Sequence, residues 1–393
     1  MCKEESVKKI ENAVVRMLIL LLCMAVCLPV LPAGADWQQP EEWFSEMSTI
    51  SGKVLEYCLT EDRDHFTLYA ESSLVRKMQE SAFVDAIHCA LDMFCKEDFT
   101  FYRTRQSSGG VKIEFKNLHL RSGLLMLEAY FSGDRSLLTR DERKCLDQVS
   151  SLMDKLIRQY GYGSINLELA IYDYICEHVE YRNYPAGDSR RMQCTSACNA
   201  FLYGWGNCQA YSDLFYMMTN MGGIDSGYIS GWADGERHIW NTVGIGTASV
   251  MVDVTYGDLD NQEYTAPEYY YFNFGLDRVN THKWVREAFS YNQTIDRKTN
   301  DKYSYYSGQS DRYGCVANKL SEVAQYAVKQ VKKGRKYAEV LLKKKGITFD
   351  NVHSALKKAI GKQQGKWTVW LDEMDDGTVV RIKWKEYKNK KIR

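Results

Sequence analysis

The chain has 393 residues, of which 45% are hydrophobic and 26% are charged. It is therefore long and apolar enough for one large core or for two or three smaller ones, and it lacks the composition of a disordered chain. Lysine plus arginine equals aspartate plus glutamate at 51 each, so no overall charge favours nucleic acid as a partner.

The first 35 residues have the order of a secretory signal. Basic residues, among them Arg16, precede an apolar run over residues 17–30, and small residues follow at 33–35. The run is shorter than the roughly 18 to 20 apolar residues that span a bilayer. We expect cleavage after Ala35, a protein that is secreted or held at the cell surface, and no stable membrane span after cleavage. A retained membrane anchor is the alternative.

Nine of the twelve cysteines follow this segment: Cys58, Cys89, Cys95, Cys145, Cys176, Cys194, Cys198, Cys208 and Cys315. In an oxidising exterior, nine thiols form at most four disulfides and leave one thiol over. The odd number favours a cysteine that stays reduced for chemistry. The segment 188–199 is predicted to be a surface loop pinned by one disulfide, although spacing does not define the pairing.

Residues 36–160 are predicted to form an N-terminal α+β module. Helical periodicity over 83–94 is followed by alternating runs at 99–102 and 111–115, with a turn between them. An amphipathic helix over 140–160 is expected to connect this module to the next domain. His88 lies on the apolar pattern of the first helix, where a lone histidine more often packs than binds a ligand.

Residues 161–290 contain the cysteine that we select as a candidate nucleophile. Cys208 follows a glycine-punctuated loop at 204–207 and precedes an apolar helical stretch that stops at 222–223. A helix N-terminus stabilises a thiolate over a thiol, and its free N–H groups can hold an oxyanion. A disulfide from Cys208 to Cys194 or Cys198 is the alternative interpretation.

Two further residues complete a candidate catalytic triad. His238 stands at the start of an alternating strand, and Asp253 is a single acid in the apolar run 250–256. A neutral imidazole can take the thiol proton and return it to a leaving group. A carboxylate among apolar residues needs a donor, which a neighbouring strand that starts at His238 would supply. A surface histidine is the alternative for His238 considered alone.

Together these segments resemble the transglutaminase-like superfamily. The likeness covers about residues 167–284, and its blocks occur in the family's order at 206–211, 238–241 and 253–256, reading Gly-Asn-Cys-Gln-Ala-Tyr, His-Ile-Trp-Asn and Asp-Val-Thr-Tyr. Ala210, Ser212 and Tyr256 replace the glycine, alanine and tryptophan that are usual there. None of these departures removes a catalytic group.

The resemblance implies an α+β fold of bacterial exported type: a papain-like transglutaminase core, with a helix-borne cysteine against an antiparallel sheet, flanked by small α+β modules. It implies a cysteine acyltransferase or cysteine peptidase that forms an acyl-enzyme from a carboxamide or peptide. The expected substrate is a protein or peptide, with cell-wall peptide as one candidate, and no cofactor or metal is predicted. The alternative is a non-catalytic module of the same fold for cell-surface binding or adhesion.

Residues 291–316 are predicted to be a linker and 317–393 a basic C-terminal α+β module. From residue 317 onward, twenty lysines and arginines face eight acids, so a solvated surface or contact with an anionic surface is expected. A helical pattern at 349–360 and two strands at 367–371 and 379–384 repeat the plan of the N-terminal module. A duplicated module, in which His353 would correspond to His88, is therefore one hypothesis, and a coincidental likeness is the alternative.

Overall fold

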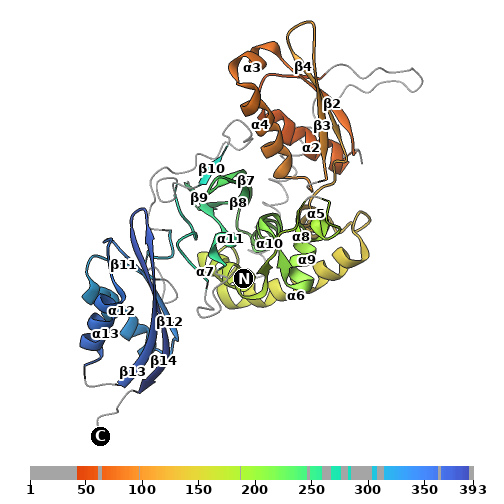
Figure 1. Ribbon diagram of the computed structural model, residues 1–393. Coiled ribbons are helices and arrows are strands. Elements are labelled where there is room, and N and C mark those ends of the chain that lie inside the picture. The colour runs from red at the N-terminus through yellow and green to blue at the C-terminus, as the bar shows by residue number, and fades with distance from the viewer. Residues whose placement is uncertain are drawn as a thin grey trace.

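The structure is a computed structural model that describes residues 42–60, 64–96, 98–185, 187–245, 248–258, 267–275, 282–284, 303–307, 314–361 and 364–388. An N-terminal module and a C-terminal module lie on opposite sides of a central domain (Figure 1). The predicted signal and its cleavage site at Ala35 fall outside the described residues, as does most of the predicted linker. In the described part of the chain, no helix is long and apolar enough to cross a membrane.

The N-terminal module is a four-stranded sheet with helices on one face. Its strand order is β1-β2-β4-β3, with β1 and β2 parallel and the other neighbours antiparallel. Alternate residues of β2 are buried against the helices, as expected for a strand with one covered face. The elements are β1 (Trp43–Phe44), α2 (Ser48–Thr60), β2 (Phe66–Ala70), α3 (Ser72–Lys77), α4 (Glu80–Asp92), β3 (Thr100–Arg105) and β4 (Val111–Lys116).

The C-terminal module repeats this topology. Its order is β11-β12-β14-β13, with β11 and β12 parallel and the other neighbours antiparallel, which agrees with the repeated plan seen in the sequence. The elements are β11 (Cys315–Ala317), α12 (Leu320–Lys332), β12 (Tyr337–Leu342), α13 (Phe349–Ile360), β13 (Gln364–Met374) and β14 (Gly377–Lys388). The two modules therefore have the same strand order and the same parallel and antiparallel pairings.

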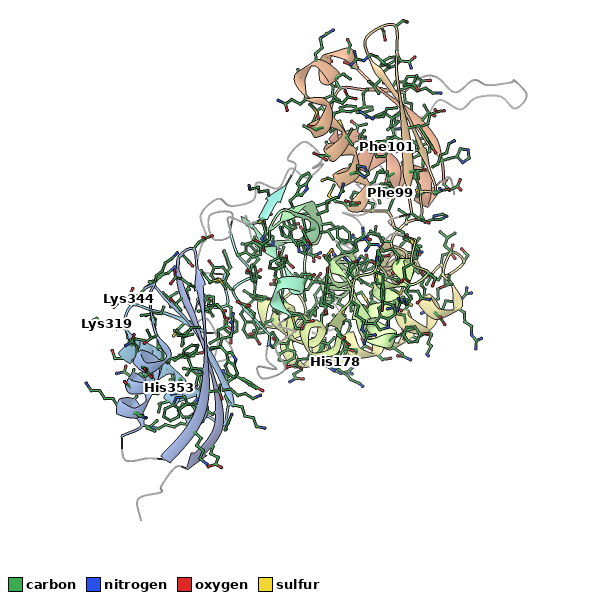
Figure 2. All side chains as sticks on the ribbon, in the orientation of Figure 1. Phe99, Phe101, His178, Lys319, Lys344 and His353 are labelled. Carbon is green, nitrogen blue, oxygen red and sulfur yellow. The ribbon has the colours of Figure 1, made fainter. Side chains whose placement is uncertain are left out.

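Two histidines occupy matching places in these modules. His88 on α4 lies against Phe101, with ring centroids 4.9 Å apart, and His353 on α13 accepts a hydrogen bond from Trp367 Nε1 at 2.8 Å. Phe101 and His353 are labelled in Figure 2. Each side chain therefore packs its helix against an aromatic residue of the third strand. This agrees with the packing role that the sequence assigned to both.

The central domain combines an antiparallel sheet with a set of helices. The sheet order is β10-β7-β8-β9, and β5 and β6 form a separate parallel pair. The helices are α5 (Ser122–Ser132), α6 (Arg140–Tyr160), α7 (Ile165–His178), α8 (Arg191–Cys194), α9 (Ala197–Tyr203), α10 (Cys208–Met221) and α11 (Val254–Gly257). The strands are β5 (Glu180–Tyr181), β6 (Trp205–Gly206), β7 (Ser226–Ala233), β8 (Glu236–Ile245), β9 (Ala248–Val252) and β10 (His282–Trp284).

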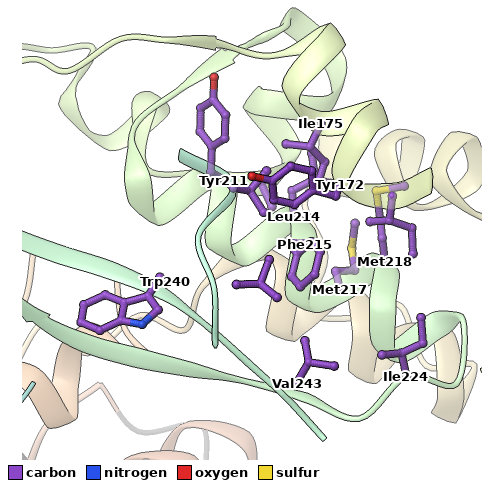
Figure 3. Packing of buried hydrophobic residues seen from close by; sticks show 14 of the residues in the cluster. Tyr172, Ile175, Tyr211, Leu214, Phe215, Met217, Met218, Ile224, Trp240 and Val243 are labelled. Carbon is purple, nitrogen blue, oxygen red and sulfur yellow. The ribbon is translucent and has the colours of Figure 1, made fainter. Parts of the chain in front are cut away.

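Helix α10 runs through the core of the central domain. Its side chains Leu214, Phe215 and Met218 are fully buried between α7 and the sheet, together with Trp240 of β8 (Figure 3). A helix that is apolar on most sides is expected to be enclosed in this way. Buried residues of α5 and α6 join the same cluster, so this core extends upstream of residue 161, where the sequence placed the start of the domain.

The C-terminal module meets the central domain through the sheet face opposite its helices. Arg381 of β14 pairs with Glu268 and, at 3.2 Å, with Glu339, and Glu339 also accepts a hydrogen bond from the backbone N–H of Tyr269 at 3.1 Å. A few residues later, Tyr271 O accepts a hydrogen bond from the backbone N–H of Asp253 at 3.0 Å. The C-terminal module thereby holds residues 268–271, and this segment is hydrogen-bonded to the backbone of Asp253.

All nine cysteines after residue 35 are described, and all are free thiols. The disulfide predicted for the loop at 188–199 therefore finds no support. Cys194 and Cys198 are both buried, and Cys194 Sγ lies 3.0 Å from Arg191 O. These cysteines act as small buried side chains, which is common for the free thiol.

Candidate active site

Cys208 is the first residue of helix α10, as the sequence predicted. The helix is capped by Asn207, whose Oδ1 accepts hydrogen bonds from the N–H groups of Gln209 at 3.0 Å and Ala210 at 3.5 Å. Asn207 is held in turn by a bond from its own N–H to Cys194 O at 2.7 Å. The N–H of Cys208 belongs to the first helical turn, whose donors have no partner within the helix. These N–H groups carry a partial positive charge, which lies next to the thiol.

His238 joins Cys208 to Asp253. The His238 side chain is in contact with Cys208, and its Nε2 lies 2.6 Å from Asp253 Oδ2. Since Nε2 faces the carboxylate, Nδ1 is the nitrogen left for the thiol. The structure thus brings together all three residues that the sequence selected, from the start of α10, from β8 and from the end of β9.

Asp253 lies one residue beyond strand β9 and caps the short helix α11, rather than lying within a strand as the sequence suggested. Its Oδ1 accepts a hydrogen bond from the N–H of Tyr256 at 3.1 Å, which leaves Oδ2 for His238. The Asp253 side chain is fully buried. A buried carboxylate of this kind is stable only with several donors.

Burial and charge oppose each other in setting the pKa values of this pair. Burial alone would lower the pKa of His238, but the charge of Asp253, its hydrogen bond and the contact with Cys208 raise that pKa to about 10. Burial alone would raise the pKa of Asp253, but His238 and His282 hold it well below its ordinary value. The favoured state at neutral pH is a charged imidazolium beside a carboxylate.

His282 is the polar residue of this cluster that the sequence did not single out. It lies on β10, opposite Ala233 of β7, and its Nε2 is 2.8 Å from Asp253 Oδ2. Its side chain is buried. The only sequence signal was one histidine 29 residues after Asp253, too weak to separate it from an ordinary core residue.

Ser212 and Asn241 fix helix α10 against strand β8. Ser212 Oγ lies 2.8 Å from Cys208 O and 2.9 Å from Ile239 O, and Asn241 Nδ2 donates to Ser212 O at 3.1 Å. The serine that departs from the usual alanine therefore adds a polar contact between the cysteine's helix and the histidine's strand. Trp240 is fully buried and stacks on His238 with ring centroids 5.8 Å apart, so it supports the imidazole ring from within the core.

The same cluster offers ligand atoms for a metal ion. The ligating atoms of His238, Asp253 and His282 all lie within 4.8 Å of one another. The two nitrogen-to-oxygen distances, 2.6 and 2.8 Å, are those of charge-assisted hydrogen bonds. Ligands around a zinc ion at about 2.0–2.2 Å stand roughly 3.3 Å or more apart, so a metal would have to widen both contacts.

Residues 145–268 match the family model of the Transglutaminase-like superfamily, and this stretch includes Cys208, His238 and Asp253. The chain therefore contains a transglutaminase-like domain. The predicted fold class is confirmed: an α+β transglutaminase-like core with the cysteine on a helix against an antiparallel sheet. No curated protein matches the chain significantly.

Three solved structures are similar to part of this chain. A candidate cysteine protease from Cytophaga hutchinsonii is 19% identical, with 40% of this chain and 62% of that chain covered and a TM-score of 0.24. A TGase is 12% identical, with 50% and 52% covered and a TM-score of 0.28. EGTA-treated LapG of Legionella pneumophila is 13% identical, with 34% and 70% covered and a TM-score of 0.23. The chain spans less than two thirds of the first two proteins.

Proposed function

We propose that the chain is an exported cysteine enzyme that transfers or hydrolyses acyl groups on protein or peptide amides, with Cys208 as its nucleophile. The observation that carries the proposal is that His238 contacts Cys208 and is hydrogen-bonded to Asp253 at 2.6 Å. A thiol at a helix N-terminus, beside an imidazole that is hydrogen-bonded to a buried carboxylate, has the parts that nucleophilic catalysis requires.

In the first half of the reaction, the Cys208 thiolate attacks the carbonyl carbon of the amide. The carbonyl oxygen takes the negative charge and is stabilised by the N–H of Cys208 at the start of α10. The C–N bond then breaks, and the leaving amine takes a proton from the His238 imidazolium. The products are the free amine and a thioester on Cys208.

In the second half, an amine or water attacks the thioester. His238, now neutral, removes the proton of the attacking group, and the C–S bond breaks to leave the Cys208 thiolate beside the His238 imidazolium. An amine gives a new amide, and water gives a carboxylic acid. Asp253 stabilises the charged form of His238 at each stage and fixes its ring through the 2.6 Å bond.

The exported location is part of the proposal and is supported by residues 1–35 alone. The basic surface expected from residue 317 onward would suit an anionic polymer at the cell surface, such as the one that carries cell-wall peptides. N-terminal sequencing of the exported protein checks the predicted cleavage site, with Asp36 expected as the first residue.

The proposed nucleophile is tested by alkylating the native protein with iodoacetamide at pH 6 and mapping the modified cysteines. Burial raises the pKa values of Cys58 and Cys315 to about 11, so both thiols stay protonated and serve as internal slow references. We expect Cys208 to react at least about tenfold faster than either. His238→Ala should remove this difference, and His178→Ala, a change on the exposed surface of α7, should leave it intact.

A second measurement separates catalysis from binding. Wild type and Cys208→Ala are compared for release of ammonia or amine from glutamine-containing peptides, with and without an added amine. Release that requires Cys208 supports the proposal, and incorporation of the added amine identifies transfer. If Cys208 reacts no faster than Cys58 and Cys315, and no amide is turned over, the non-catalytic surface-binding hypothesis replaces it.

A further inference from the structure

We infer that His282 is a fourth member of the reaction centre: a positioning residue that donates from Nε2 to the same Asp253 oxygen that His238 contacts. The inference rests on the function proposed for Cys208. It adds to that function a residue from a different strand, β10, which pairs with β7 on the side of β7 away from β8.

The contacts of Asp253 define what His282 does. Asp253 Oδ1 accepts from the N–H of Tyr256 at 3.1 Å, and Oδ2 lies 2.6 Å from His238 Nε2 and 2.8 Å from His282 Nε2. A carboxylate with three donors is held in one orientation and strongly favours its charged form. If the His282 bond is removed, His238 is the donor that remains on Oδ2 among the described residues, and His238 must also move protons during the reaction.

Packing holds the His282 ring in place but does not account for its polarity. The ring meets Trp240 edge-on, with centroids 5.0 Å apart, and lies 5.0 Å from Tyr256 and 5.6 Å from Phe274. A phenylalanine would fit such an aromatic site at least as well. A histidine at this position is explained by the nitrogen that it directs at Asp253.

Four other ionisable groups near Asp253 stay neutral across the pH range of interest. Burial raises the pKa values of Tyr172 and Cys176 on α7, and it also raises those of Tyr256 on α11 and of Tyr271. None of these four groups therefore ionises between pH 4 and pH 9.

Asp234, in the turn between β7 and β8, is a further carboxylate that contacts a neighbour of Asp253. It accepts the hydroxyl hydrogen of Tyr256 at 2.8 Å, so its contact is with the tyrosine tip rather than with Asp253. Among the described residues, the ionisable side chains hydrogen-bonded to Asp253 are therefore His238 and His282.

The experiment compares two replacements of His282 by the rate at which iodoacetamide modifies Cys208 between pH 4 and pH 9. His282→Phe keeps the ring volume and removes the donor, whereas His282→Gln keeps an N–H donor near the position of Nε2. For wild type we expect a plateau that extends far to the acid side. For His282→Phe we expect the acid limb to move toward neutral pH by about one pH unit or more. His282→Gln should restore most of that shift.

The outcomes distinguish this inference from the proposed function. If wild-type Cys208 shows no acid-side plateau, the proposed function fails. If wild type shows the plateau and His282→Phe reproduces it, the positioning role of His282 is wrong. A wild-type profile that moves on addition of EDTA would also overturn it, because a metal ion would then join the cluster. Should His282→Phe not fold, as judged by circular dichroism, His282→Met and His282→Gln provide the same comparison.

Discussion

Two buried carboxylates of the central domain behave in opposite ways. Asp253 follows β9 and receives contacts from His238, His282 and the N–H of Tyr256, which hold its pKa well below the ordinary value. Glu168 on α7 is equally buried, but burial raises its pKa to about 8. The same burial thus accompanies a permanent charge at one site and a largely neutral acid at the other.

The number of donors explains the difference. Glu168 Oε2 accepts one bond, from Asn273 Nδ2 at 3.3 Å, and among the described residues Glu168 Oε1 has no hydrogen-bond partner. An uncharged amide at that distance offsets little of the cost of burying a charge. Two imidazoles and a backbone N–H offset most of it at Asp253. A buried acid is therefore a sign of catalysis only when its donors lead to a reactive group.

The largest expected effect is on catalysis. Asp253→Asn should lower kcat/KM for amide turnover by roughly 10³- to 10⁴-fold, because the imidazolium loses its carboxylate and its correct tautomer. Glu168→Gln should leave kcat/KM within about twofold, since Glu168 contacts Asn273 and not the triad. Steady-state kinetics with a glutamine peptide measure both. Equal losses in the two variants would mean that Asp253 acts only through the fold.

A second effect, on the order of a few kcal/mol, is expected in stability. The folded pKa of Glu168, about 8, lies above the ordinary value of 4.5. The folded protein therefore keeps a proton that the unfolded chain releases, and stability falls as pH rises from about 4.5 to about 8. Glu168→Gln should flatten this decline, as measured by urea unfolding at pH 5, 6, 7 and 8.

Glu177→Gln is the matched control, because Glu177 is exposed on the same helix. It should leave the pH dependence of unfolding unchanged. Asp253 has the opposite sign: its folded pKa is lowered, so its stabilising contribution is present above about pH 4 and is lost as pH falls below that. If the stability of Glu168→Gln still fell as much as that of wild type between pH 5 and pH 8, Glu168 would not be the buried acid that takes up a proton on folding.

The smallest expected effect concerns the amide that contacts Glu168. Asn273 has a positive φ of 52°, so Asn273→Gly removes the amide without forcing a side chain into the left-handed region. Loss of the 3.3 Å bond should destabilise the protein by about 1 kcal/mol. Alkylation of Cys208 should be unchanged. A large fall in Cys208 reactivity in this variant would show that the two acids are coupled.

Local features of the site could be predicted because they depend on neighbours in the chain. The loop before Cys208 and the apolar residues after it indicated the start of a helix, which the structure places at Cys208 with Asn207 as its cap. The amphipathic pattern of residues 140–160 likewise predicted helix α6. The same pattern did not show that α6 packs in the central core, since periodicity reveals an apolar face but not what covers it.

The sequence by itself determined the order of the cysteine, histidine and aspartate segments, the helix that begins at Cys208 and the plan shared by the outer modules. Only the tertiary structure showed that Asp253 keeps its charge whereas Glu168 keeps a proton, since each is one acid among apolar neighbours in the sequence. It also decided that His282, 29 residues from Asp253, reaches the same carboxylate. The physical reason is that helix starts and strand alternation arise from bonds between near neighbours. The charge of a buried group depends instead on donors that folding brings from distant strands.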